Sequence, residues 1–230
     1  EYHRASFIGA LPKFLNQFPD RQEKESIDRI LQKSEVLYLG MDLSRFDEFQ
    51  HHENKERPTI LWNHRWEYDK NPEEFFEALF RLKEIGLAFD LIVLGEQNDV
   101  HPPIFEKAKH VLANQIIHWG YATTFEQYAR LLWTADILPV TSNQDFFGGS
   151  VVEAMYCGCV PLLPNRLAYP EHLTEEQKNE CLYEEGELTT RLATMIKEFE
   201  DIKSSSIVIK YDWKKLIALY NDRMQLLATQ

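Results

Sequence analysis

Two basic side chains, Arg65 and Lys70, lie five residues apart in an aromatic-rich stretch that follows a short apolar run. A loop of this length can turn both side chains toward one point. Arginine offers a planar fork to phosphate oxygens and lysine offers a point charge, so the pair suits the diphosphate of a nucleotide. The alternative is a surface ion pair of Arg65 with Glu67 or Asp69, which is common and contributes little stability.

A second cluster spans residues 145–153, which read DFFGGSVVE and lead into a predicted helix. Unpaired N–H groups at a helix start, with the positive end of the helix dipole, bind anions, and glycines let a ligand approach the backbone. The carboxylates of Asp145 and Glu153 could face one pocket and accept hydrogen bonds from sugar or ribose hydroxyls. The alternatives are a helix cap for Asp145 and a favourable first-turn charge for Glu153. A Gly-Gly pair alone is weak evidence for phosphate binding.

The elements that must position these clusters alternate between short apolar runs and amphipathic segments. Asn71 and Glu74 have the spacing of a capping box at a helix start. The run 91–94 is typical of a strand buried on both faces of a parallel sheet, whereas Pro139 is unusual inside a strand. Strands are expected at 59–62, 91–94, 115–117, 136–141 and 160–163, and helices at 72–86, 124–133 and 149–156.

This repetition of strand and helix predicts an α/β fold, a Rossmann-like doubly wound parallel sheet. Such sheets bind ligands at the carboxyl ends of their strands. Both clusters follow predicted strands, so we expect them to meet at that edge. Further helices are expected around 27–31, over 187–203 and from 211 onward.

The composition excludes several classes of protein. A chain of 230 residues and 27.2 kDa can bury a sizeable core. Twenty-five Lys and Arg against 37 Asp and Glu give a net charge of −12, which argues against a general polyanion binder. No apolar run approaches the roughly 18 residues of a membrane span. Cys157, Cys159 and Cys181 are interpreted as free thiols in a reducing compartment, the cytoplasm, and no metal-ligand cluster is visible.

Taken together, these residues resemble the family 4 retaining glycosyltransferases of the GT-B fold. The loop with Arg65 and Lys70 is similar to their Arg-x4-Lys diphosphate loop, and Asp145-x7-Glu153 to their Glu-x7-Glu motif. Residues 38–46 are similar to the junction between their two domains. The phrases WNHRWEYDKNPEEFF, VLGEQ, HWGY and VVEAMYCGCVPLLPNRLAYPE resemble the tRNA-queuosine mannosyltransferase group. The resemblance covers nearly the whole chain and is sharpest over 59–171.

The resemblance implies a division into two parts. Residues 1–57 would be the remnant of an N-terminal domain and the interdomain linker, with a helix and a strand before residue 46. Residues 58–230 would be the nucleotide-sugar-binding domain, ending in a helix that crosses back to the first. The chain begins with Glu1 rather than Met, so we expect it to be a piece of a longer protein that binds donor but turns over poorly or not at all.

The resemblance also implies roles for single residues. Arg65 and Lys70 would neutralise the donor diphosphate, and Asp145 would orient the transferred sugar, which makes these three the catalytic residues. Glu153 would bind the ribose hydroxyls. The donor would also contact Tyr121 beside the base, the backbone of Phe146 and Phe147, and the backbone of Gly148, Gly149 and Ser150. This sequence has Asp145 where the family has glutamate, which shortens the reach to the sugar by one methylene.

The implied chemistry is transfer of a sugar, mannose from GDP-mannose, to an acceptor, queuosine in tRNA. The acceptor would be held mainly by the rest of the N-terminal domain, and no cofactor beyond the donor is expected. No protein nucleophile is needed, and His64 and His118 fit packed roles as well as catalytic ones. Two alternatives remain: a sugar-nucleotide epimerase of the GT-B fold, and a non-catalytic nucleotide-binding or assembly module. Donor, acceptor and oligomeric state do not follow from the residues.

Overall fold

The structure is a computed structural model that describes residues 1–20, 22–51, 54–97, 100–199 and 207–229. Its centre is a six-stranded sheet with the order β3-β2-β1-β4-β5-β6, in which every neighbouring pair is parallel. The strands are β1 (Thr59–Asn63), β2 (Asp90–Leu94), β3 (Ile116–Gly120), β4 (Ile137–Pro139), β5 (Val160–Pro164) and β6 (Leu182–Tyr183). This order is that of the Rossmann fold, which confirms the predicted fold class.

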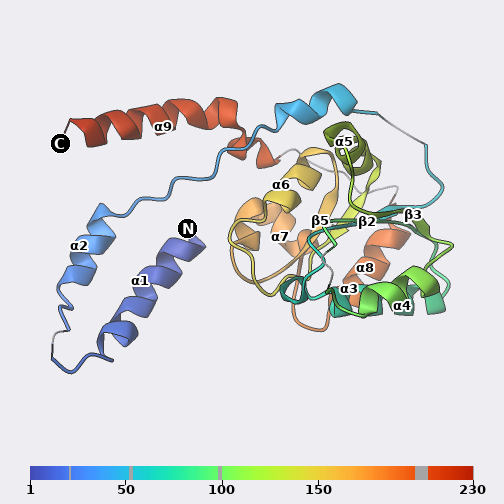
Figure 1. The fold of residues 1–230 in the computed structure, drawn as a ribbon, viewed down its shortest axis with the longest axis horizontal. Helices are drawn as coiled ribbons and strands as arrows, with labels where there is room; N and C mark the ends of the chain where they lie inside the picture. The colour runs from blue at the N-terminus through green and yellow to red at the C-terminus, as the bar shows by residue number, and fades with distance from the viewer. Residues whose placement is uncertain (21, 52–53, 98–99, 200–206, 230) are drawn as a thin grey trace.

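Helices cover both faces of the sheet, because the strands carry apolar residues on both. Leu61 faces one core cluster, while Ile60 and Trp62 face the other, as alternation along a strand requires. Figure 1 shows α5 and α6 on one side of the sheet and α3, α4 and α8 on the other. Their bounds are α3 (Pro72–Glu84), α4 (Ile104–Val111), α5 (Phe125–Thr134), α6 (Gly149–Tyr156), α7 (Glu175–Cys181) and α8 (Leu188–Lys197).

The capping box predicted at Asn71 is wrong. Asn71 has a φ of 51°, in the left-handed region, and its side chain makes no cap to the backbone of α3. Its amide Nδ2 instead donates to Oε2 of Glu74 at 2.6 Å. The reason is local, because Asn71 also ends the 3-10 helix η2 (Tyr68–Lys70). The end of that helix fixes the backbone of Asn71 in the left-handed conformation. A capping box does form at α7, between Thr174 and Gln177.

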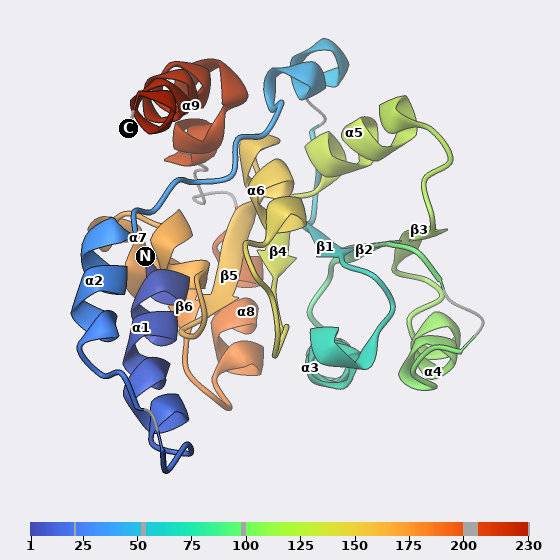
Figure 2. The same ribbon diagram turned by 60° about the vertical axis from the view of Figure 1, so that its left-hand side comes forward.

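Three helices lie outside the sheet and its covering layers. These are α1 (Tyr2–Leu15), α2 (Ser26–Lys33) and α9 (Trp213–Ala228), and Figures 1 and 2 show them projecting from one end of the domain, with α1 beside α2. The strand expected before residue 46 is absent from the described part of that segment, apart from a single bridge of Met41 with Asp212.

The last helix, α9, contacts the segment before the sheet domain. The hydroxyl of Tyr220 donates to the carbonyl of Tyr38 at 2.7 Å, and Arg223 pairs with Glu35 at 2.8 Å. The ring of Trp213 lies directly against Gly40. In the described residues, no helix combines the length and apolarity needed to cross a membrane.

Candidate functional site

The site lies where the strand order reverses. β1 and β4 are neighbours in the sheet, but the chain leaves them in opposite directions, toward β2 and toward β5. The loops that follow two such strands separate, and the crevice between them is where open α/β sheets bind ligands. Both sequence clusters fall in these two loops, after Asn63 and after Pro139.

Lys70 joins the two loops. Its ammonium Nζ donates to the carbonyl of Gln144 at 2.8 Å and lies 3.2 Å from Asp69 and 3.6 Å from Asp145. Its own carbonyl accepts from the hydroxyl of Thr141 at 2.8 Å. The residue is only 8% exposed, so its charge is fixed in place at the floor of the crevice.

Arg65 lies at the rim of the same crevice. Its side chain is 57% exposed and its Nη1 pairs with Oε1 of Glu67 at 3.0 Å. The surface ion pair considered as an alternative is therefore present, yet Arg65 also lines the same pocket as Lys70. An exposed pair of this kind stabilises the fold by less than about 1 kcal/mol, so it can open for an anionic ligand at little cost.

Asp145 organises the second loop. Its Oδ1 accepts from the backbone N–H groups of Gly148 at 2.9 Å and Phe147 at 3.3 Å, and its Oδ2 accepts from the hydroxyl of Tyr169 at 3.1 Å. Burial alone would raise the pKa of this carboxyl, but Lys70 and these hydrogen bonds outweigh it and lower the pKa. Asp145 is therefore a carboxylate that both shapes the loop and faces the crevice.

The amino end of α6 completes the floor. Gly148 is its N-cap, with a φ of 77° that favours glycine, and no side chain caps the helix. Gly149 and Ser150 line the crevice, so the helix start points its polar end at the pocket. Phe146 and Phe147 do not line it: Phe146 is 79% exposed and stacks on His3, and Phe147 packs on His172.

These groups enclose a pocket of about 420 Å³. The predicted site residues that it brings together are Arg65, Lys70, Tyr121, Asp145, Gly149 and Ser150. A second pocket of about 350 Å³ adjoins it and shares Asn63, Gly95 and Tyr121 as common walls. Two joined compartments, one with cations and one with the ring of Tyr121 and apolar walls, have the layout that a nucleotide needs.

Glu153 does not line either pocket but bonds to a residue that does. Its Oε1 accepts from Arg45 at 2.8 Å and its Oε2 from the hydroxyl of Tyr128 at 2.7 Å. Tyr128 in turn accepts from the amide of Asn63 at 3.0 Å, and both of these residues line the second pocket. Burial raises the pKa of Tyr128 well above its ordinary value, and Glu153 adds to the shift, so the phenol keeps its proton.

Several residues in or near the site carried no role in the sequence prediction, notably Asn63, Gly95 and Tyr169, and the role of His64 was left open between packing and catalysis. Gly95 was visible as the glycine ending a buried strand. A side chain there would overlap the carbonyl of His64, 2.0 Å from an added Cβ. Tyr169 lies 24 residues from its partner Asp145, a separation that no local pattern reports. His118 bonds through Nε2 to the carbonyl of Gly120.

The cysteines have no place in the site. Cys157, Cys159 and Cys181 are buried and free, and burial raises the pKa of each thiol, to about 11 for Cys181. They are core thiols, as expected. Within the described ranges, no group of three or more His, Cys, Asp or Glu residues could hold a metal ion. His51, in the expected linker, bonds to Phe49 and Thr134, and its neighbour His52 lies outside the described residues.

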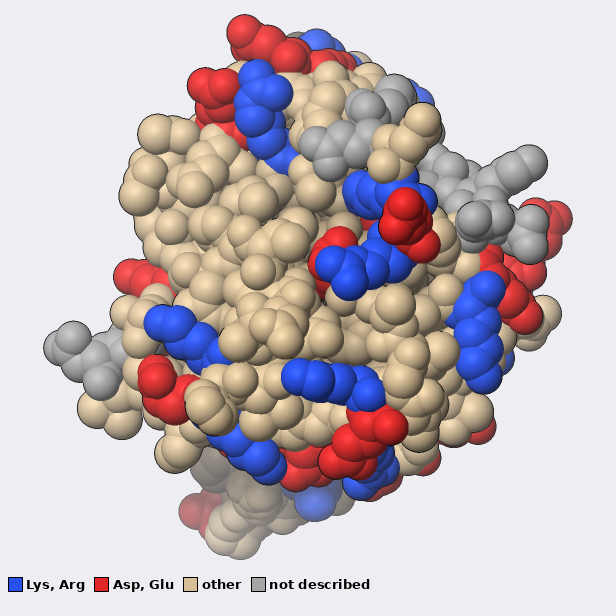
Figure 3. Space-filling model, turned by 90° about the vertical axis from the view of Figure 1, so that its right-hand side faces the viewer, with Lys and Arg blue, Asp and Glu red and all other residues tan. Residues whose placement is uncertain are grey.

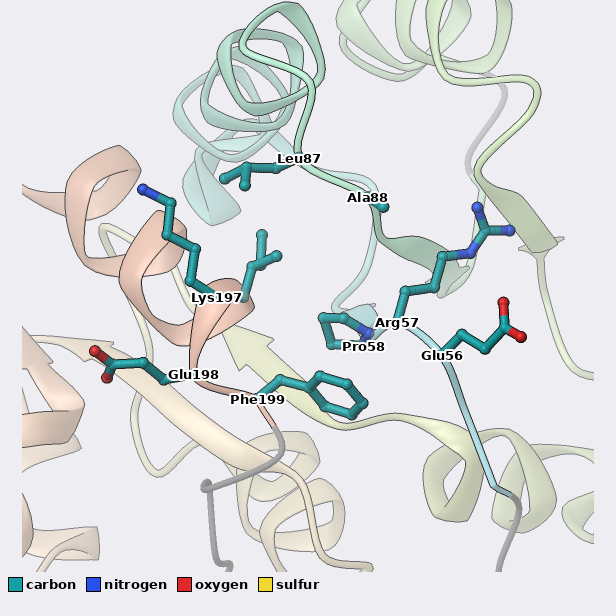
Figure 4. Close-up of a pocket in the computed structure, with 9 residues that line it drawn as sticks. Glu56, Arg57, Pro58, Leu87, Ala88, Lys197, Glu198 and Phe199 are labelled. Atoms are coloured by element: carbon teal, nitrogen blue, oxygen red, sulfur yellow. The ribbon is translucent and has the colours of Figure 1, made fainter.

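Another cavity, of about 340 Å³, lies at the opposite edge of the sheet, at the amino ends of β1 and β2 (Figure 4). Pro58 and Phe199 lie toward its middle, while the charged ends of Arg57 and Lys197 point to opposite sides. Arg57 is paired with Asp90 at 2.8 Å. This cavity lacks converging cations and lies away from the strand ends where such folds bind ligands.

The face of the molecule at the β3 and α4 end mixes charges of both signs. On the face at the β3 and α4 end, Lys and Arg alternate with Asp and Glu in small separate areas around a broad uncharged one (Figure 3). That face of the described chain shows no continuous basic surface, in keeping with the net charge of −12. A nucleic-acid backbone would need such a surface.

Comparison with known proteins agrees with this geometry. Residues 44–214 match the model for glycosyl transferases group 1, and residues 1–41 match that for the tRNA-queuosine alpha-mannosyltransferase N-terminal region. The chain is 32% identical over 184 residues to tRNA-queuosine alpha-mannosyltransferase of Drosophila melanogaster, covering 76% of this chain and 48% of that protein. The chain therefore spans about half the length of this relative.

Solved structures show the same fold. HepE of Anabaena in complex with UDP superposes with a TM-score of 0.62 at 16% identity, over 87% of this chain and 58% of that one. Sucrose-phosphate synthase of Thermosynechococcus elongatus gives 0.61 at 15% identity, over 90% and 57%. In both comparisons this chain matches only a part of a longer GT-B chain. With the family model matched across most of the chain, this protein belongs to the group 1 glycosyltransferases.

Proposed function

We propose that this chain is the donor-binding part of a retaining hexosyltransferase and that its pocket holds the diphosphate of a nucleotide sugar. The observation that carries this proposal is the meeting of Lys70 and the amino end of α6 at the switch point between β1 and β4. The adjoining pocket with Tyr121 and Tyr128 would take the nucleoside.

The chemistry follows from the charges. Transfer breaks the bond between the sugar and the diphosphate, so negative charge grows on the leaving diphosphate. Lys70 is held in place by its bonds to the protein, and α6 is fixed by the sheet, so neither must reorganise as that charge grows. Fixed charges of this kind are often the largest single contribution to catalysis. Asp145 would accept hydrogen bonds from the transferred sugar.

The finer assignment is mannose transfer from GDP-mannose to queuosine in tRNA, in the cytoplasm. Its support is the 32% identity to a protein described as tRNA-queuosine alpha-mannosyltransferase, and the matching N-terminal family over residues 1–41. Because the chain has a net charge of −12, we propose that the tRNA is held mainly by parts of the protein outside this chain.

Calorimetric titration of the chain with GDP, UDP, ADP and GDP-mannose tests the proposal. We expect saturable binding of at least one nucleoside diphosphate, with the guanine ligands tightest. Arg65→Gln should weaken that binding by about five-fold, since it removes a cation facing the ligand. Arg130→Gln is the matched control, because Arg130 also forms an exposed ion pair, with Glu126, but on the outside of α5.

The outcomes separate cleanly. No binding of any of the four ligands would contradict the proposal and favour a non-catalytic assembly module. Equal affinity in the Arg65 and Arg130 variants would leave Arg65 as a surface ion pair only. Tightest binding of UDP or ADP would keep the donor-binding role and overturn the choice of GDP-mannose.

A further inference from the structure

His64 follows β1 directly and lines the candidate pocket together with Arg65 and Lys70. The residue is 5% exposed, and its Nε2 is buried with no hydrogen-bond partner. Its ring is held in place: its carbonyl accepts the indole N–H of Trp62 at 2.9 Å, and the two rings meet edge-on at 5.3 Å. Nearly all buried polar atoms in proteins are paired, so this exception calls for a partner outside the chain.

Burial keeps His64 neutral at pH 7. Burial lowers the pKa of its imidazole to about 4, and Lys70 contributes in the same direction, which outweighs the opposite effect of Asp145 and Asp69. A neutral imidazole carries one N–H donor and one acceptor nitrogen. The pocket thus contains a hydrogen-bonding group that brings no charge of its own.

We propose that His64 donates its imidazole N–H to a phosphate oxygen of the bound nucleoside diphosphate. This inference rests on the proposed function. The pocket also includes the exposed carboxylate of Glu96, and the donors among its neighbours are the ammonium of Lys70 and the start of α6 at Gly149 and Ser150. A group that accepts from all of them is an oxyanion. Asp145, the acceptor nearby, already bonds to Phe147, Gly148 and Tyr169 and faces Lys70.

The role of the uncharged donor is distinct from that of the cations. It adds a hydrogen bond that strengthens as charge grows on the leaving diphosphate. Gly95 is needed for this position of His64, because any larger residue there would clash with the backbone carbonyl of His64 and displace the residue. His64 would therefore be a ligand-contacting residue whose position is set by the strand ends of β1 and β2.

The test uses whichever nucleoside diphosphate binds the wild-type chain most tightly, together with its sugar-linked form. His64→Phe keeps a planar ring but removes the N–H, whereas His64→Gln restores an N–H donor near the position of Nε2. We expect the Phe variant to bind both ligands about ten-fold more weakly, and the Gln variant to stay within about three-fold of wild type. The control is His110→Phe, at an exposed histidine on α4.

Wild-type affinity in a folded His64→Phe variant would overturn this inference and leave the proposed function intact. Failure of the wild-type chain to bind any nucleotide would instead overturn the proposed function and this inference with it. A loss confined to the sugar-linked ligand would place His64 at the sugar and overturn the phosphate assignment. If His64→Phe does not fold, ¹⁵N-histidine spectra of the wild-type chain decide, since the diphosphate must shift the His64 ring resonances and unshifted resonances contradict the contact.

Discussion

At the scale of single residues, the two cations of the pocket contribute in different ways. Lys70 is nearly buried and bonded to Gln144, Asp69 and Asp145, so its charge is already placed where a diphosphate would bind. Arg65 is exposed and paired with Glu67 at the rim. We expect Lys70 to set the affinity for the diphosphate and Arg65 to add to it after its surface ion pair opens.

Asp145→Asn should lower the free energy of unfolding by about 2 kcal/mol. The physical reason is the loss of a carboxylate that accepts two backbone N–H groups and faces the buried charge of Lys70. Urea unfolding of the two chains measures the difference. Asp222→Asn, at an exposed position on α9, is the control and should stay within about 0.5 kcal/mol of wild type. Equal stability of the Asp145 variant and wild type would contradict this account of the loop.

The sequence predicted the chemical types at the site but not their contacts. The spacing of Arg65 and Lys70 in one loop predicted that both would face one pocket. The hydrogen bond from Lys70 to Gln144 joins residues that are 74 apart in the sequence. The Nε2 of His64 has no hydrogen-bond partner because no residue in the described part of the folded chain lies beside it to supply one. Contacts between residues so far apart leave no pattern in the local sequence from which they could be predicted.

At the scale of elements, the site depends on how closely the ends of β1 and β2 approach. Gly95→Ala should abolish nucleotide binding and destabilise the fold by more than about 2 kcal/mol, because the added Cβ would lie 2.0 Å from the carbonyl of His64. Gly86→Ala is the control: Gly86 also has a positive φ, 80° against 127° for Gly95, but nothing lies within 4 Å of its Cβ position. Its cost should be about 1 kcal/mol, with binding unchanged. Calorimetry and urea unfolding of both variants give the comparison, and intact binding by Gly95→Ala would contradict it.

The loop of Asp145 is also fixed from the side by the turn η3 (Tyr169–His172). His172 bonds through Nε2 to the carbonyl of Phe147 at 2.7 Å and through Nδ1 to the hydroxyl of Tyr211 at 3.0 Å. Tyr211 belongs to the segment that leads into α9, and its carbonyl accepts from the backbone N–H of Met41 at 2.8 Å. His172 thus connects the loop of Asp145 with the segment that leads into α9.

Stability should fall on acidification because of His172. Burial lowers the pKa of this imidazole to about 4, so between pH 6.5 and 4 the unfolded chain binds a proton that the folded chain does not. Since stability decreases wherever the unfolded state binds more protons as pH falls, His172 should account for roughly 2 kcal/mol of the loss between pH 7 and 4.5. Urea unfolding at both pH values should show a smaller loss for His172→Gln than for wild type or for the exposed variant His110→Gln. Equal losses in all three chains would contradict this.

Elements with a clear apolar pattern were predicted from the sequence, whereas the 14-residue helix α1 was not. The apolar run of β2 and the amphipathic faces of α3 and α5 appear as expected. β4 is confined to Ile137–Pro139, shorter than the predicted 136–141, and β6 has two residues. α4 and α7 were not predicted, although α6, which like α4 has eight residues, was.

At the scale of the whole molecule, the site belongs to the sheet domain alone. α1 and α2 contain no buried residue, and their exposed apolar side chains include Phe7 at 56% and Phe14 at 53%. α9 exposes Met224 and Leu227 in the same way. These flanking helices therefore leave apolar side chains exposed in the single chain.

Removal of residues 1–33 should leave nucleotide affinity within about two-fold of wild type and change the free energy of unfolding by less than about 1.5 kcal/mol. The reason is that this segment touches the sheet domain mainly at its very start, where the backbone of Tyr2 donates to Glu171 and the ring of His3 stacks on Phe146. Calorimetry and urea unfolding of the shortened chain check both numbers. A large loss of nucleotide affinity would contradict this and show that α1 helps to shape the loop of Asp145.

We expect Lys70 to recognise the second phosphate of a bound nucleotide. The most direct measurement is the ratio of the dissociation constants for a nucleoside monophosphate and its diphosphate, in the wild-type chain and in Lys70→Met. Methionine keeps most of the volume of the buried side chain and removes the charge, and Lys109→Met on the exposed side of α4 is the control. We predict a preference of at least about ten-fold for the diphosphate in wild type and control, and one below about three-fold in Lys70→Met. An unchanged preference in a folded Lys70→Met chain would contradict the claim.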